Sequence, residues 1–122
     1  MNNCKAFLIL IIIIVFSLAA CSSKPTIGSS PRESLVKKYF QDDNTYIIIA
    51  RGYPKPGLPE IQAINTAQEA ALTNAQVIAR QSFDDSVDVI KAGRVKQYEN
   101  RGNHVVITYV ITWKNLKNHI TQ

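Results

Sequence analysis

The stretch PEIQAINTAQEAALTNAQVIARQS, residues 59–82, decides the fold. It predicts one long helix, because small or apolar residues recur every three or four positions: Ile61, Ile64, Ala67, Ala71, Ala75, Ile78 and Ser82. Pro59 suits the start of a helix, and Glu60 stands in the first turn, where the helix dipole favours an acid. Since this stripe is narrow and rich in alanine, we expect the helix to approach a sheet closely.

The segments on either side of this helix predict strands. Residues 45–53 (TYIIIARGY) are rich in β-branched and aromatic residues and apolar on both faces, which is typical of an internal strand. Residues 86–98 and 104–113 predict a β-hairpin with its turn at 99–103, where Gly102 can adopt a positive φ. Alternate residues from 105 to 113 are all apolar, which indicates a sheet with one well-covered face. We expect Gly93 to mark a bulge.

A short helix is predicted before the first strand. Residues 30–33 (SPRE) form a capping box with proline at the first helical position. Four apolar residues then share one helical face: Leu35, Val36, Tyr39 and Phe40. We expect this face to pack on the domain; the alternative is an amphipathic helix that touches a membrane, aided by Lys37 and Lys38.

The predicted fold class is therefore α+β. A short N-terminal helix is followed by a strand, the long helix and the β-hairpin, and the three strands form a small sheet packed on the long helix. The crossover between the first two strands is expected to be right-handed.

The N-terminus has the features of a targeting segment. Lys5 supplies positive charge, and residues 6–16 (AFLILIIIIVF) are apolar. The apolar and small residues end at Ala20, which makes the stretch short for a bilayer span of about 20 residues. A transmembrane anchor and a plain secretory signal are the alternatives, but Cys21 favours a third reading.

Residues 18–21, Leu-Ala-Ala-Cys, resemble the bacterial lipobox that ends a lipoprotein signal peptide. The resemblance implies cleavage after Ala20, diacylglycerol on the Cys21 sulfur and acylation of the new amine, commonly as palmitate. Two or more acyl chains give stable membrane anchoring. Ser22 in place of Asp implies sorting to the outer membrane, on its periplasmic side. Cys4 leaves with the signal, so no cysteine pair remains to form a disulfide.

Three parts of the chain follow from these patterns. Residues 1–20 are the predicted signal peptide, and residues 21–30 are a polar tether that carries the lipidated cysteine. Residues 31–122 are a single α+β periplasmic domain.

Part of the chain resembles a family of bacterial lipoproteins. Residues 49–53 (IARGY), Pro56, Gln62 and residues 67–81 (AQEAALTNAQVIARQ) are similar to small membrane-associated lipoproteins of the twenty-kilodalton Lpp type. The resemblance covers residues 46–113. It implies an α/β domain held at the outer membrane without catalysis, in a wider group with roles in the flagellum or the cell envelope. The periplasmic SIMPL-type domains show a weaker resemblance.

The residues give no constellation for catalysis or for a metal. The histidines, His104 and His119, fall beside a turn and in the tail, and residues 84–88 (DDSVD) lack the glycine and glutamate of a calcium loop. We therefore expect no enzyme activity, no cofactor and no metal.

Charge gives a further lead. Residues 86–122 hold six basic and two acidic residues, so the excess positive charge of the chain lies in the hairpin and tail. This is compatible with a solvated sheet face or with a binding module for anionic lipopolysaccharide or peptidoglycan, through Arg94, Lys96 and Arg101. The preferred hypothesis is an interaction protein that binds itself or an envelope protein through its sheet edges or mixed face. A small periplasmic inhibitor or immunity-like protein is a third reading, and nucleic acid is not expected as a partner.

Overall fold

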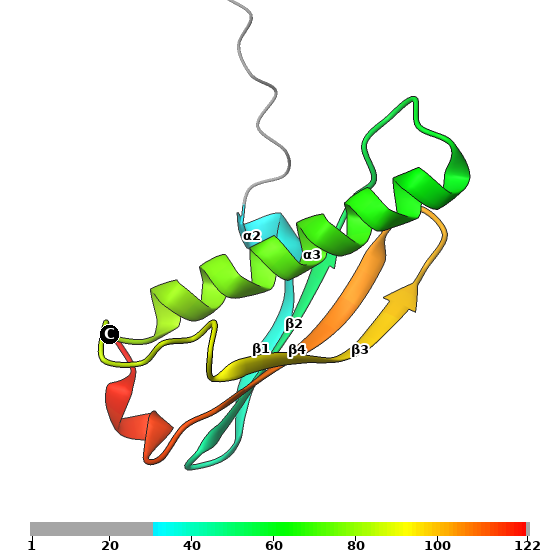
Figure 1. Ribbon diagram of the computed structural model, residues 1–122. Helices are drawn as coiled ribbons and strands as arrows, with labels where there is room; N and C mark the ends of the chain where they lie inside the picture. Colours follow the sequence, from blue (N-terminus) through cyan, green and yellow to red (C-terminus); the bar gives the residue numbers. More distant parts are fainter. Residues whose placement is uncertain (1–30, 122) are drawn as a thin grey trace, which may run out of the picture.

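The structure is a computed structural model that describes residues 31–121. The predicted signal peptide, Cys21 and the tether lie outside these residues. The described chain runs in the order α2 (Pro31–Ser34), β1 (Leu35–Asp42), β2 (Thr45–Gly52), α3 (Glu60–Ser82), β3 (Gly93–Asn100), β4 (Val105–Thr112) and the 3₁₀ helix η2 (Leu116–His119). The fold is α+β, as predicted: one long helix lies across one face of an antiparallel sheet (Figure 1).

The sheet has four strands in the order β1-β2-β4-β3, and not the three that the sequence predicted. The internal position of β2 is confirmed, because it pairs with β1 on one side and with β4 on the other. β2 and β3 therefore run parallel with β4 between them, and α3 provides the crossover that connects them.

The additional strand, β1, comes from the segment predicted as a helix. Only residues 31–34 are helical, and Leu35–Asp42 pairs with β2 instead. Leu35 lies opposite Ala50 and Phe40 opposite Tyr46, so both face α3 although their odd spacing would place them on opposite sides of a regular strand. A register shift between Leu35 and Lys37 makes this possible. The strand is favoured because it pairs with an edge of β2 that would otherwise be left open.

The core lies between α3 and the sheet. Its members on α3 are mostly alanines, and they meet alternate residues of β2 and β4: Ala67, Ala71, Ala75, Ala79, Tyr46, Ile48, Ala50, Val105, Ile107, Tyr109 and Ile111. The close approach that the alanines predicted is confirmed at Gly52, where an added Cβ would stand 2.2 Å from the backbone nitrogen of Ala71. Only glycine fits there, so Gly52 and Ala71 together set the distance between helix and sheet.

The hairpin is confirmed, but its first strand begins at Gly93 and not at residue 86. Residues 84–92 form a loop, because the Asp84 carboxylate accepts a hydrogen bond from Ser86 N and the Asp88 carboxylate accepts one from Lys91 N. The predicted bulge at Gly93 is wrong: the register shift lies between Val95 and Gln97. Gly93 is needed for another reason, since an added Cβ would meet the Tyr109 hydroxyl.

Candidate functional site

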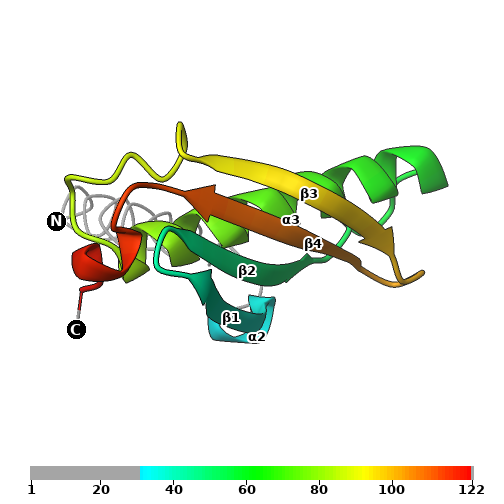
Figure 2. The same cartoon turned by 90° about the horizontal axis from the view of Figure 1, so that it is seen from below.

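The face of the sheet opposite α3 is left uncovered by the described elements (Figure 2). Figure 2 shows the four strands from this side, with α3 behind them. We call it the open face. Its residues are those that alternate with the core residues in each strand.

The strand register arranges the open face in three rows across the sheet. The first row is Tyr39, Ile47, Val110 and Arg94, the second is Lys37, Ile49, Thr108 and Gln97, and the third is Arg51, Val106 and Glu99. Each row therefore has aliphatic or hydroxyl side chains in the middle and longer polar or aromatic side chains toward the edges. Such a surface combines an apolar centre with a polar rim, which is the usual composition of a protein interface.

A hollow of about 430 Å³ occupies the part of the open face around the second and third rows. Its lining is Val36, Ile49, Arg51, Gln97, Glu99, Arg101, His104, Val106 and Thr108. Apolar side chains from three strands form the middle of the hollow, and side chains with hydrogen-bond donors surround them.

Arg51 is a partly buried charged group in this hollow. Its strand, β2, is internal, and its backbone carbonyl accepts a hydrogen bond of 2.9 Å from the Asn74 amide of α3. Among the described residues, its buried Nε has no hydrogen-bond partner. A buried donor without a partner is costly, and such groups often lie where a ligand or a water molecule binds.

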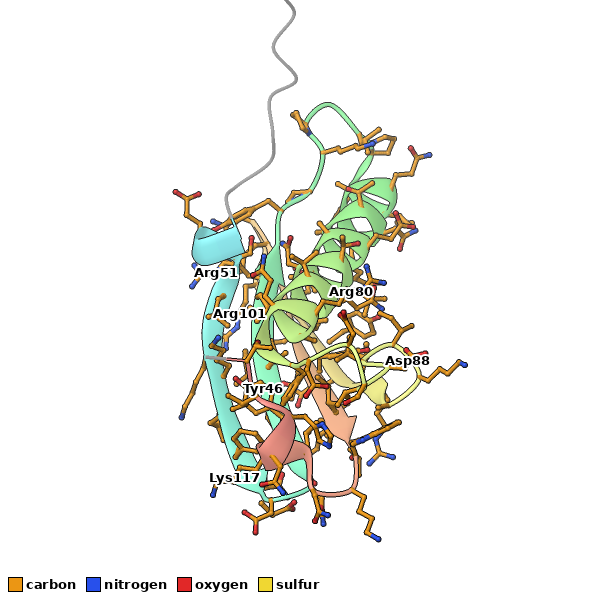
Figure 3. The ribbon with its side chains drawn as sticks, turned by 90° about the vertical axis from the view of Figure 1, so that its left-hand side faces the viewer. Tyr46, Arg51, Arg80, Asp88, Arg101 and Lys117 are labelled. Atoms are coloured by element: carbon orange, nitrogen blue, oxygen red, sulfur yellow. The ribbon has the colours of Figure 1, made fainter. Side chains whose placement is uncertain are left out.

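Arg101 approaches the same hollow from the turn after β3, and both arginines are labelled in Figure 3. Its Nη2 lies 3.0 Å from Oε1 of Glu99. Both side chains are about half exposed, so this ion pair adds little to stability. The pair holds the Arg101 side chain beside the hollow without burying its charge.

The structure does not gather the three predicted ligand-binding residues at one place. Arg101 lines the hollow, whereas Arg94 lies in the first row. Arg94 is four residues, or about 13 Å, farther along the strands than Arg51, and it is also two strands across from it. Lys96 lies at the register shift of β3 and is exposed. The sequence analysis missed Arg51, although an arginine that ends an otherwise apolar internal strand was a usable signal.

The two sheet edges are less suited to pairing than the open face is to binding. β1 is interrupted by register shifts between Leu35 and Lys37 and between Phe40 and Asp42, and it carries Lys37 and Lys38. β3 has its shift at the exposed Lys96. Bulges and lysines on edge strands are common devices against edge-to-edge association.

One cluster of Ser, His and Asp side chains lies at the other end of the domain. His119 Nδ1 lies 2.9 Å from Ser86 Oγ and 3.2 Å from Asp84 Oδ2. In an acyl-transfer triad the serine and the carboxylate use opposite nitrogens of the imidazole. Here both contact the same nitrogen, so the cluster joins the C-terminal segment to the end of α3 and does not form a nucleophile.

No helix within residues 31–121 has both the length and the apolarity to cross a bilayer. Over the same residues, no three His, Cys, Asp or Glu side chains are placed to hold a metal ion.

Comparisons of the chain with models of protein families, with curated proteins and with solved structures found no match. The resemblance to the Lpp-type lipoproteins therefore remains a prediction from the residues quoted above.

Proposed function

We propose that this chain is a lipoprotein anchored by Cys21 on the periplasmic side of the outer membrane. Its α+β domain is a non-catalytic interaction module that binds another envelope protein through the open face, in the flagellum or elsewhere in the envelope. The lipobox-like residues 18–21 support the anchor. The open face supports the binding role.

The observation that carries the binding role is the exposure of one sheet face while the other is sealed by α3. β2 and β4 place Ile49 and Val106 on the open face, where both remain partly exposed. Within residues 31–121 no element covers them. Because the bulged, lysine-bearing edges disfavour strand pairing, face-on binding is the better use of this sheet.

The second candidate is a binding module for an anionic envelope ligand, lipopolysaccharide or peptidoglycan. It is favoured by the two guanidinium groups at the hollow, Arg51 and Arg101. It is the weaker candidate, because Arg94 lies at a distance from these groups and Glu99 is paired with Arg101.

The anchor is tested by metabolic labelling with a clickable palmitate analogue. We expect the wild-type chain to carry the label and to fractionate with outer membranes, and the Cys21→Ser variant to lose both properties. An unlabelled wild-type chain, or one that keeps its leader, would contradict the anchor.

The binding role is tested by photo-crosslinking in intact cells. Benzoylphenylalanine at position 106 lies on the open face, and the same residue at position 69 lies on the exposed surface of α3 as a matched control. We expect a discrete crosslinked protein from position 106 and none from position 69. Equal products from both positions would show that the face has no special role.

A further inference from the structure

The hollow on the open face has two chemical characters that a single ligand must match. Its middle is apolar, formed by Val36, Ile49 and Val106. Its polar side contains the Arg51 and Arg101 guanidinium groups with the Thr108 hydroxyl. A wholly polar ion would leave the apolar part unused, and a wholly apolar group would leave the Arg51 Nε without a partner.

The charge of the hollow limits the charge of the ligand. Arg51 and Arg101 supply two positive charges and Glu99 supplies one negative charge, so one positive charge is in excess. A carboxylate, with a single negative charge, balances this excess. A phosphate monoester carries about −1.5 to −2 and would also lie close to Glu99, so it fits less well.

The geometry of Arg51 makes it the principal partner. Its Nε is buried and lacks a hydrogen-bond partner among residues 31–121. A guanidinium group can bind a carboxylate with two parallel N–H donors, one of them at Nε. Once the Arg51 side chain turns its enclosed Nε toward the hollow, a carboxylate there would satisfy a donor that the described residues leave unsatisfied.

We propose that this hollow binds an acidic peptide segment of the partner protein, with the carboxylate of an Asp or Glu on Arg51 and an adjacent apolar side chain against Ile49 and Val106. The inference rests on the proposed function, since it names the group that the open face recognises. Arg101 is a second, more exposed donor at the same site.

The test uses the full chain in detergent micelles and NMR signals of the arginine Nε–H groups. The probe is an acetylated and amidated pentapeptide with a central glutamate between valines; the matched control peptide has glutamine there. We expect the glutamate peptide to shift the Arg51 Nε–H signal in a saturable manner and the Arg94 signal to remain in place. The glutamine peptide should bind at least about tenfold more weakly, because it forms no charge-assisted pair.

Two variants separate the site from general electrostatics. Arg51→Gln should weaken binding of the glutamate peptide about tenfold or more, and Arg94→Gln, which removes the same charge two rows away, should have little effect. If Arg51→Gln fails to fold, the wild-type titration decides alone. Equal binding of the two peptides, or an unmoved Arg51 signal, would overturn the proposal.

Inorganic phosphate and lipopolysaccharide micelles are tested in parallel. If either shifts the Arg51 signal at lower concentrations than the peptide, the hollow recognises phosphate and the proposal is wrong. Failure here is distinct from failure of the proposed function: crosslinks from position 106 would show a protein bound at the open face even if its carboxylates played no part.

Discussion

Gly52 of β2 lies against the backbone of Ala71 in α3, with room for a hydrogen atom and not for a methyl group. A Cβ on residue 52 would stand 2.2 Å from the Ala71 nitrogen and 2.3 Å from the Ala67 oxygen. Both are backbone atoms in the middle of a helix, so neither can move without displacing the helix. This contact fixes how closely α3 lies on the sheet.

Gly52→Ala should therefore destabilise the domain by about 1–3 kcal/mol, the usual range for overpacking a core. The measurement is chemical denaturation followed by circular dichroism. Gly102→Ala is the control, because residue 102 has a φ of +86° but open space around its Cβ position. Its free energy of unfolding should fall by only about 1 kcal/mol, which is the steric cost of a positive φ for a residue that has a Cβ. Equal losses in the two variants would show that the close contact is unimportant.

Tyr109→Phe should destabilise the domain by about 1–2 kcal/mol, because the buried Tyr109 hydroxyl donates to the Val89 carbonyl oxygen at 2.9 Å. Burial also raises the pKa of Tyr109 above 10.0. The folded state therefore holds this proton more tightly than the unfolded state, and the stability falls as the pH rises above about 10.

The check is the free energy of unfolding measured from pH 7 to pH 11. We expect the free energy of unfolding to fall less above pH 10 in Tyr109→Phe than in the wild type, because the variant lacks this ionising hydroxyl. Tyr98→Phe, at an exposed position on β3, is the matched Tyr→Phe control. If the free energy of unfolding fell equally steeply above pH 10 in all three proteins, the proposed contribution of Tyr109 would be contradicted.

Asp84→Asn should loosen the C-terminal segment. The Ser86 hydroxyl and the Ser86 backbone N–H donate to the Asp84 carboxylate, and His119 adds to their effect, so the pKa of Asp84 lies below 3.8. A lowered pKa stabilises the fold at pH values above 3.8, and this stability is lost as the pH falls through the pKa of the folded state.

Hydrogen exchange of the Asp84 and Thr121 amides, which bond to His119 O and Ser82 O, reports this segment. We expect faster exchange of these amides in Asp84→Asn at pH 7, and a smaller difference from the wild type below pH 3.8. Asp85→Asn, at the next exposed position, is the control and should exchange like the wild type.

Replacing both Lys37 and Lys38 by threonine should promote association. These lysines lie on the edge strand β1, where charge disfavours pairing with the edge of another molecule. We expect an increased proportion of dimers or larger species in size-exclusion chromatography with light scattering. Lys55→Thr in the loop before α3 is the control. An unchanged size distribution in the double variant would show that the bulges alone protect the edge.

The sequence predicted α3, β2 and β4 because their patterns are local and regular. Periodicity along residues 61–82 identified the helix, and alternation along residues 105–113 identified the covered face. The prediction failed at β1 because the spacings of Leu35 to Tyr39 and of Val36 to Phe40 suit a helix. In the strand, a register shift brings Leu35 and Phe40 to one side instead. The prediction failed at the start of β3 because Val87 and Val89 alternate like strand residues, while Asp84 and Asp88 hold a loop.

The candidate site was predicted only in part, for a related reason. The excess of positive charge after residue 86 indicated Arg101, but a count of charges carries no information on register. Arg51 lies in a segment with balanced charge and comes beside Val106 only through the pairing of β2 with β4. Pairings between strands far apart in the chain are decided by tertiary packing, so a local pattern could not reveal them.

The effect of a substitution in this sheet depends on which face of the sheet the side chain occupies. In β2, residues 46, 48, 50 and 52 pack toward α3, whereas residues 47, 49 and 51 point to the other side. Changes in the first set alter the hydrophobic core, whereas changes at residues 49 and 51 of the second set alter chiefly the exposed surface; Ile47 is itself buried. Homologous chains could therefore diverge in what they recognise, one odd-numbered position at a time, while the helix-facing half of each strand keeps the domain folded.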